Sequence, residues 1–145
     1  MSGTLASSWI VWALMAAVFA ALTAILAKVG VSSADPELAT LVRTLVISAL
    51  LAGFLAVTGR LRAIGGMSGQ TYLWLAASGV ATGASWVCYF RALKLGNASQ
   101  VAPVDKLSVV LVAILAALFL GERLSLSGWA GVALIAGGAI LVARG

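Results

Sequence analysis

The sequence predicts an all-α integral membrane protein, a bundle of five transmembrane helices. Hydrophobic residues make up 63% of the 145 positions and charged residues 9%, whereas a soluble domain needs roughly a quarter charged residues. Five apolar segments follow one another along the chain. Each has close to the length that a helix needs to cross a bilayer, which is about 20 residues. The spans must be helical because lipid cannot satisfy exposed backbone groups, and a membrane barrel would show short alternating segments instead. We expect one transmembrane domain over residues 1–145, with spans at about Trp9–Val29, Glu37–Val57, Thr71–Ala92, Gln100–Leu120 and Leu126–Ala143.

Capping and turn residues separate these spans. The first span follows Met1–Ser8, which carries no Lys or Arg, and its apolar run is too long for a signal-peptide core, so we expect a retained membrane helix. Asp35-Pro36-Glu37 provides an N-cap, a first-turn proline and an acid for the second span. Thr58-Gly59-Arg60 predicts the end of that helix. The longest polar interval, Thr58–Gln70, then leads to the third span and leaves no room for a soluble domain.

The last two spans have their own signals. Ser99 is the predicted cap of the fourth span, and Ser125 or Ser127 that of the fifth, after the turn Gly121-Glu122-Arg123. Pro103 removes a backbone hydrogen bond and either bends the fourth span or occupies its first turn, if that span begins near Ala102. The fifth span is rich in Gly and Ala, which suits close helix packing.

Three charged residues fall inside predicted spans at a distance from the span ends, namely Arg43, Asp105 and Lys106. Each costs about 2.5–3.5 kcal/mol near mid-helix on insertion scales, so a charge kept there usually has a function or a partner. Arg43 lies six residues past Glu37, and Asp105 six past Ser99, which is about 9 Å along each helix. We therefore predict an Arg43–Asp105 partnership if the two spans face one another. The alternative for Arg43 and Lys106 is snorkelling toward the headgroups.

A polar stripe marks the third span. Ser78, Thr82, Ser85 and Tyr89 recur at steps of four, three and four, which places them on one helix face. They either line a cavity or join helices through their hydroxyls. Trp86 borders the stripe and either forms an aromatic wall or only packs. Together with the three charges, these residues are the predicted site for substrate binding or translocation.

Several function classes are excluded by composition. The chain has no His and a single Cys, Cys88, so an internal disulfide is impossible and a metal site is not expected. Nor do we find an acid pair, a nucleophile–base set or a phosphate loop, so we expect no enzyme and no cofactor. The net charge of +5 is explained by basic residues that flank membrane spans rather than by nucleic-acid binding.

The basic residues are almost evenly divided between the two faces. Face A holds the N-terminus and face B the C-terminus, because an odd number of spans separates them. Face A has three positive charges, Arg60, Arg62 and Arg123; face B has four, Lys28, Arg91, Lys94 and Arg144. Orientation follows an excess of Lys and Arg on one face. A difference of one predicts either insertion in both orientations or a weak preference for face B inside.

Two stretches resemble the EamA-type drug/metabolite transporters. Tyr89-Phe90-Arg91-Ala92-Leu93, followed by Asn97-Ala98-Ser99-Gln100-Val101-Ala102, is similar to the junction of that family's third and fourth spans. Leu120-Gly121-Glu122-Arg123-Leu124, followed by Gly128-Trp129-Ala130-Gly131, resembles its signature before the last helix of a repeat, and Arg43 matches an arginine common there. Two features depart from the pattern: the family's deeper proline would stand near Ser108-Val109, and Asp105-Lys106 is not a general family mark.

The resemblance implies a cofactor-free transporter of small metabolites in the cytoplasmic membrane. Most relatives have ten spans in two inverted repeats, so this chain is expected to be one half of an inverted-repeat transporter. Combined with the charge balance, this predicts an antiparallel homodimer that works by alternating access on a substrate of anionic or zwitterionic type. The alternative is a non-transporting membrane subunit, or a lipid-flippase component, that pairs with a second similar chain.

Overall fold

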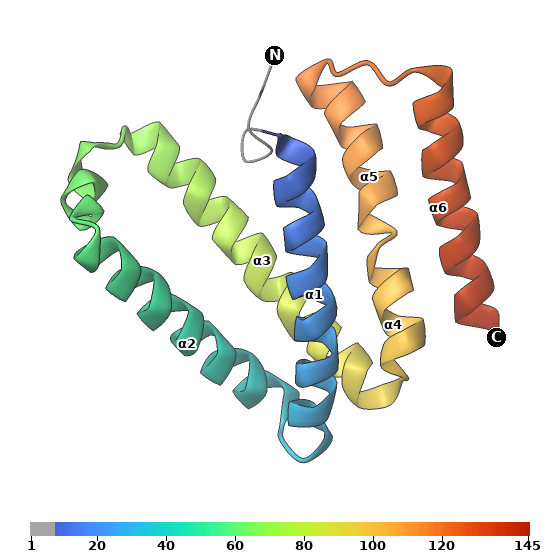
Figure 1. Ribbon diagram of the computed structural model, residues 1–145, viewed down its shortest axis with the longest axis horizontal. Helices are drawn as coiled ribbons and strands as arrows, with labels where there is room; N and C mark the ends of the chain where they lie inside the picture. Colours follow the sequence, from blue (N-terminus) through green and yellow to red (C-terminus); the bar gives the residue numbers. More distant parts are fainter. Residues whose placement is uncertain (1–7) are drawn as a thin grey trace. The chain divides into compact units, whose positions relative to one another are not determined.

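In the computed structural model, which describes residues 8–145, every regular element of that range is helical. Figure 1 gives the order of the helices. The elements are α1 (Trp9–Ser32), α2 (Pro36–Val57), the 3₁₀ helix η2 (Arg60–Gly66), α3 (Gly69–Leu95), α4 (Ala98–Asp105), α5 (Ser108–Leu115), the π-helical turn η3 (Ala116–Leu120) and α6 (Leu126–Arg144). Five helices are long and apolar enough to cross a membrane when α4, α5 and η3 are taken as one span, Ala98–Leu120. The predicted all-α membrane fold is confirmed.

The chain divides into two compact units. One unit comprises residues 27–94, that is, the end of α1, all of α2 and η2, and almost all of α3. The other comprises residues up to Leu26 together with Leu95–Gly145, of which residues 1–7 of the predicted N-terminal segment lie outside the described range. Within the first unit, α2 and α3 are the antiparallel arms of a hairpin with η2 at its turn (Figure 1).

The start of α2 matches the prediction from its sequence. Asp35 is the N-cap, and its Oδ1 accepts hydrogen bonds from the backbone N–H groups of Glu37 (3.0 Å) and Leu38 (3.1 Å). Pro36 occupies the first helical position, where its missing N–H is not needed. The bond from the Leu38 N–H is the main cause that lowers the pKa of the Asp35 carboxyl below its ordinary value of 3.8, because it stabilises the ionised form.

The polar interval after α2 is more ordered than a loop. Gly59 has a φ of 69°, a left-handed conformation that glycine adopts without steric cost, and it lies between α2 and η2. The Tyr72 hydroxyl donates to the Ile64 carbonyl and so ties η2 to the first turn of α3. The sequence does not predict this helix, because a short 3₁₀ helix needs no long apolar periodicity.

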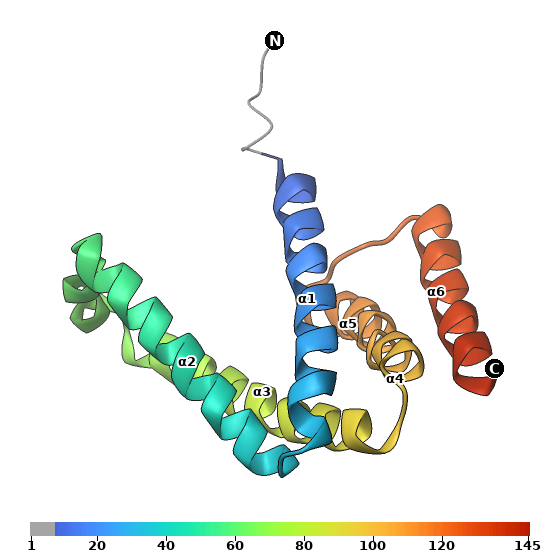
Figure 2. The same cartoon turned by 60° about the horizontal axis from the view of Figure 1, so that its bottom comes forward.

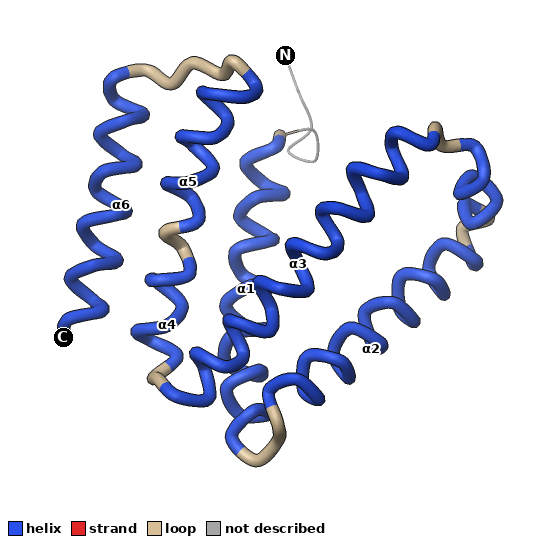
Figure 3. The backbone as a smooth tube through the Cα atoms, turned by 180° about the vertical axis from the view of Figure 1, so that it is seen from behind, coloured by secondary structure: helices blue, strands red, loops and turns tan. Residues whose placement is uncertain are grey.

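The fourth span corrects two expectations. It begins at Ala98 with Asn97 as its cap residue, so Ser99 is not the cap but lies within the first turn, and a start near Ala102 is wrong. Pro103 is inside α4, and the helix is interrupted at Lys106–Leu107 before α5 resumes at Ser108. Figure 3 shows this interruption as a short non-helical segment. The interruption therefore begins three residues after Pro103, at Lys106, and not just before Asp105 as predicted. There the Leu107 N–H donates to the Val104 carbonyl (3.0 Å), which is the tighter i→i−3 turn.

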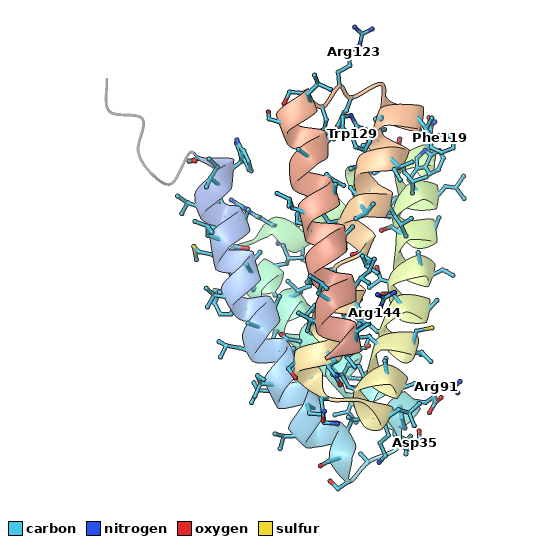
Figure 4. All side chains as sticks on the ribbon, turned by 90° about the vertical axis from the view of Figure 1, so that its right-hand side faces the viewer. Asp35, Arg91, Phe119, Arg123, Trp129 and Arg144 are labelled. Carbon is cyan, nitrogen blue, oxygen red and sulfur yellow. The ribbon has the colours of Figure 1, made fainter. Side chains whose placement is uncertain are left out.

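The second unit contains the last three helices, with α6 running beside α4 and α5 (Figures 1 and 2). Gly121 ends η3 with a φ of 68°, and the next N–H, of Glu122, donates to the Ala116 carbonyl (3.2 Å). Ser125 caps α6 by accepting from the Gly128 N–H (3.2 Å), which decides between the two predicted serines. In Figure 4, Arg123 projects from the connection between the helices.

Large apolar side chains are mostly exposed in both units. The long apolar residues of α1 and α2, such as Leu26 and Leu50, are about as exposed as those of α6. Complete burial is confined to Val31 and Leu93 among the larger side chains of the described range. A chain in water would hide such surface, whereas lipid is its natural solvent, in agreement with the predicted membrane location.

Candidate substrate-binding and translocation site

Arg43 lies between two aromatic rings of the neighbouring helix. Its Cζ atom is 4.3 Å from the centroid of the Trp86 ring and 5.6 Å from that of Phe90. The two aromatic residues are four positions apart on α3, so both rings emerge from one helix face. Both distances are within the about 6 Å over which an aromatic face attracts a cation. The predicted intramembrane arginine is thus held by cation–π contacts.

The position of the guanidinium argues against simple snorkelling. Trp86 lies about one helical turn farther from the C-terminal end of α3 than Phe90, and the guanidinium is nearer to the Trp86 ring. A snorkelling arginine would extend toward the helix end instead. The Arg43 residue is half-buried, and Phe90 is buried. Its charge therefore stays beside the deeper of the two rings.

Arg43 has no anionic partner within its own unit, residues 27–94. In that unit no hydrogen bond joins its guanidinium to an acceptor, and no ion pair joins it to a carboxylate. Aromatic faces attract the positive charge but do not accept the five N–H groups, which lie in the guanidinium plane. Within this unit the five N–H groups therefore have no oxygen acceptor.

Asp105 and Lys106 form a pair of their own. The Lys106 Nζ donates to the Asp105 Oδ2 at 3.3 Å, and the two side chains are 56% and 36% exposed, respectively. The pair lies where α4 ends and the fourth span is interrupted. Arg43 belongs to the first unit and this pair to the second, so the Arg43–Asp105 partnership stays a prediction.

The hydroxyl stripe of α3 has the predicted spacing. The Thr82 hydroxyl donates to the Ser78 carbonyl at 2.9 Å, and so spends its proton within its own helix. Ser78, Thr82 and Ser85 are exposed, whereas Tyr89 and Trp86 are half-buried. Trp86 contacts a charged group, because its ring is the nearer of the two aromatic rings to the Arg43 guanidinium. Whether the exposed hydroxyls line a substrate path stays a prediction.

Two lysines cap the ends of each other's helices close to this cluster. Lys94, near the end of α3, donates from Nζ to the carbonyls at the end of α1 and just beyond it, those of Val31 (2.9 Å), Ser32 (3.1 Å) and Ala34 (2.9 Å). Lys28 of α1 donates from Nζ to the Leu93 carbonyl of α3 at 2.7 Å. The last carbonyls of a helix lack an internal partner and carry negative dipole charge, so each lysine stabilises the other helix. We call these two residues the lysine clasp.

An ion pair joins α2 to α3 at the same end. Glu37, in the first turn of α2, pairs with Arg91 of α3. Figure 4 shows Arg91 at the end of the first unit where Asp35 begins α2. The pair lies about 9 Å along α2 from Arg43, given six residues at 1.5 Å each. Arg43 therefore lies more than one helical turn along α2 from the polar end that the Glu37–Arg91 pair marks.

Sequence reasoning missed Phe90, the Glu37–Arg91 ion pair and the lysine clasp. Phe90 was detectable as the residue four positions after Trp86, a spacing that places two rings together. From the sequence alone, the basic residues at the helix ends indicate only the orientation of the spans. Their hydrogen bonds depend on which helix ends meet, which the local sequence does not encode.

Comparison with known proteins identifies a transporter family and a relative of similar length. The model of the EamA-like transporter family matches residues 7–144. A curated protein described as an uncharacterized transporter in the cobO 3′ region of Sinorhizobium sp. is 56% identical over 139 residues, a match that covers 96% of this chain and 99% of the relative. No solved structure matches the chain.

Proposed function

Because the chain belongs to the EamA-like transporter family and is a multi-pass membrane transporter, we propose that it moves small metabolites across the cytoplasmic membrane by alternating access. The proposed substrates are anionic or zwitterionic. The proposed working unit is an antiparallel homodimer, with Arg43, Asp105 and Lys106 and the polar side of α3 along the path. The relevant α3 residues are Ser78, Thr82, Ser85, Trp86 and Tyr89.

The main support is the set of charges kept inside the spans. Arg43 of α2 lies over two aromatic rings of α3. The Asp105–Lys106 pair lies where the fourth span is interrupted. Interrupted helices and intramembrane ions are expensive in lipid and recur along substrate pathways. A purely structural subunit would have no need of either.

The homodimer is supported by length and by charge. The curated relative is matched over 99% of its own length, so that protein has about the length of one five-helix repeat. Since transporters of inverted-repeat design need two halves of opposite orientation, a second copy inserted the other way supplies the missing half. The near balance of Arg and Lys between the two faces permits both orientations.

A topology experiment tests the antiparallel dimer. In a Cys88→Ala background, a Gly145→Cys substitution places one thiol at the C-terminus, and a membrane-impermeant thiol reagent is added outside sealed cells or after permeabilisation. We expect about half of the molecules to react before permeabilisation, since the charge bias is nearly zero. Uniform labelling from one side would exclude the antiparallel homodimer.

A flux experiment tests the pathway. Proteoliposomes containing only this protein are given a panel of radiolabelled carboxylates, amino acids and amines, with a proton gradient imposed and then removed. Asp105→Asn is expected to abolish uptake without reducing insertion, whereas the matched control Glu122→Gln, at an exposed acid after η3, should transport normally. Normal flux in the Asp105 variant would refute its role. Flux that requires a second similar chain would instead support the heteromeric alternative.

A further inference from the structure

We propose that Arg43, held over Trp86 and Phe90, is the anchoring site for a carboxylate group of the substrate. This inference rests on the proposed transport function and deepens it by naming the group that is recognised. Its starting point is an arginine within a membrane span whose charge no acid of its own unit, residues 27–94, neutralises. A cation in that position is normally paired.

The two rings hold the guanidinium but do not satisfy its hydrogen bonds. Cation–π contacts of the observed kind are favourable and offset part of the insertion cost of the charge. They attract the positive charge, whose Cζ lies 4.3 Å from the centroid of the Trp86 ring, but neither ring carries an oxygen that could accept from the N–H groups. The N–H groups point outward in the plane and match two oxygens of a planar oxyanion. The rings also restrict the side chain, which reduces the entropy lost on binding.

The charge balance favours a monoanion. Arg43 is one positive charge, and the other basic groups of the first unit near this end are engaged: Arg91 with Glu37, and Lys28 and Lys94 with backbone carbonyls. A phosphate monoester carries nearly two charges at neutral pH, and one arginine would leave the second charge unpaired. A carboxylate is fully compensated.

Depth separates a solute carboxylate from a lipid headgroup. A lipid phosphodiester also carries one charge, but it approaches from the helix ends, where Glu37 and Arg91 already form an ion pair. Arg43 lies about 9 Å farther along α2, beside the deeper ring. A small acid that enters the bundle fits this depth, and its remaining part has the exposed hydroxyls of Thr82 and Ser85 along the same helix.

The test measures binding, not transport. Purified full-length protein in an uncharged detergent is titrated calorimetrically with benzoate and with benzamide, which has the same shape but no charge. Benzoate should bind at least about tenfold more tightly, which corresponds to about 1.4 kcal/mol. Arg43→Lys should lose about tenfold in benzoate affinity because an ammonium cannot form the two-pronged contact, and Arg43→Gln should lose it altogether. Arg91→Gln is the matched control and should bind benzoate within about twofold of the wild type, since such changes are below 0.5 kcal/mol. Equal affinity for benzamide, or unchanged binding in Arg43→Gln, would overturn the proposal.

A second measurement avoids the risk that the Arg43 variants do not fold. Phenylglyoxal modifies arginines, and mass spectrometry of the wild-type protein reports each site separately. Benzoate should slow the modification of Arg43 and not that of Arg60 in η2; equal rates at Arg43 with and without benzoate would overturn the proposal. Repeating the experiment in nanodiscs identifies the lipid alternative. Protection of Arg43 by phosphatidylglycerol over phosphatidylcholine, with no effect of benzoate, would assign the site to a headgroup and also overturn it.

The outcomes also separate this inference from the transport function. Benzoate protection of Arg43 without flux of any solute would leave the carboxylate site standing and refute transport. Flux of the panel solutes without benzoate protection of Arg43 would refute the carboxylate site and leave the transport function standing.

Discussion

Replacing Lys94 by Met should measure what the lysine clasp contributes to stability. Met keeps the unbranched apolar stem of Lys94 and removes its ammonium, so three hydrogen bonds to the carbonyls of Val31, Ser32 and Ala34 are lost. The bond to Val31 is partly buried, whereas the other two are exposed. A hydrogen bond to a charged group contributes about 1.5–3 kcal/mol when protected from water and less when water can replace it.

These values give an expected loss for Lys94→Met. The partly buried bond accounts for about 1.5–2 kcal/mol, and the interaction of the cation with the C-terminal end of α1 for about 0.3–1 kcal/mol more. We expect water to replace most of the two exposed bonds. The sum is a destabilisation of about 2–3 kcal/mol.

The assay is reversible unfolding in mixed micelles of mild detergent and SDS, followed by far-UV circular dichroism. Arg144→Met is the matched control, because Arg144 carries the same charge on the same predicted face, and its side chain makes no hydrogen bond or ion pair with the described residues of its own unit. It should change the unfolding free energy by less than about 0.5 kcal/mol. An equal and small effect of both substitutions would show that the clasp is a surface contact without energetic weight, and the reasoning would be wrong.

Three further outcomes follow from other parts of the structure. Asp35→Ala should lower the thermal midpoint through loss of the N-cap, whereas Asp35→Asn should keep the cap and remove its titration. The pKa of Asp35 in the folded protein lies below 3.8. The stability that its ionised carboxyl contributes is therefore fully present above the pKa of the unfolded chain, and it is lost as the pH falls through the pKa of the folded protein. Thermal scans from pH 6 to 2 should show this loss in the wild type and not in Asp35→Asn. Gly121→Ala should cost about 1–2 kcal/mol in the same unfolding assay, because an alanine is strained at a φ of 68°, while Gly53→Ala, in the interior of α2 with open space around its Cα, should be neutral or stabilising. Arg91→Gln should change stability by less than about 1 kcal/mol, since its ion pair with Glu37 is 64% and 41% exposed; a loss of 3 kcal/mol would show that lipid shields the pair.

The sequence predicted the elements well because membrane length and capping act locally. Asp35 and Ser125 lie where an N-cap is needed, and the structure uses both. The fourth span was harder, because Asn97 and Ser99 are both good caps and local chemistry does not choose between them. Pro103 predicts a bend just before Asp105, whereas the structure interrupts the helix at Lys106–Leu107.

The site was predicted as a set of residues but not as a set of contacts. Arg43 and Trp86 were identified separately, from charge inside a span and from proximity to a polar stripe. Their contact joins residues of two helices and depends on how α2 and α3 are rotated about their axes, which periodicity alone leaves open. Asp105 and Lys106, adjacent in the chain, needed no such information to form their pair.

The lysine clasp also fixes an order of events during synthesis. Lys28 and its acceptor carbonyl on Leu93 are 65 residues apart, and the bonds of Lys94 reach back over 60 to 63 residues. At about 5–20 residues per second, a ribosome needs roughly 3–13 s to deliver the later partner. Throughout that interval the last carbonyls of the first helix must rely on water or headgroups, so its final turn should become resistant to proteolysis only after the third helix has left the ribosome.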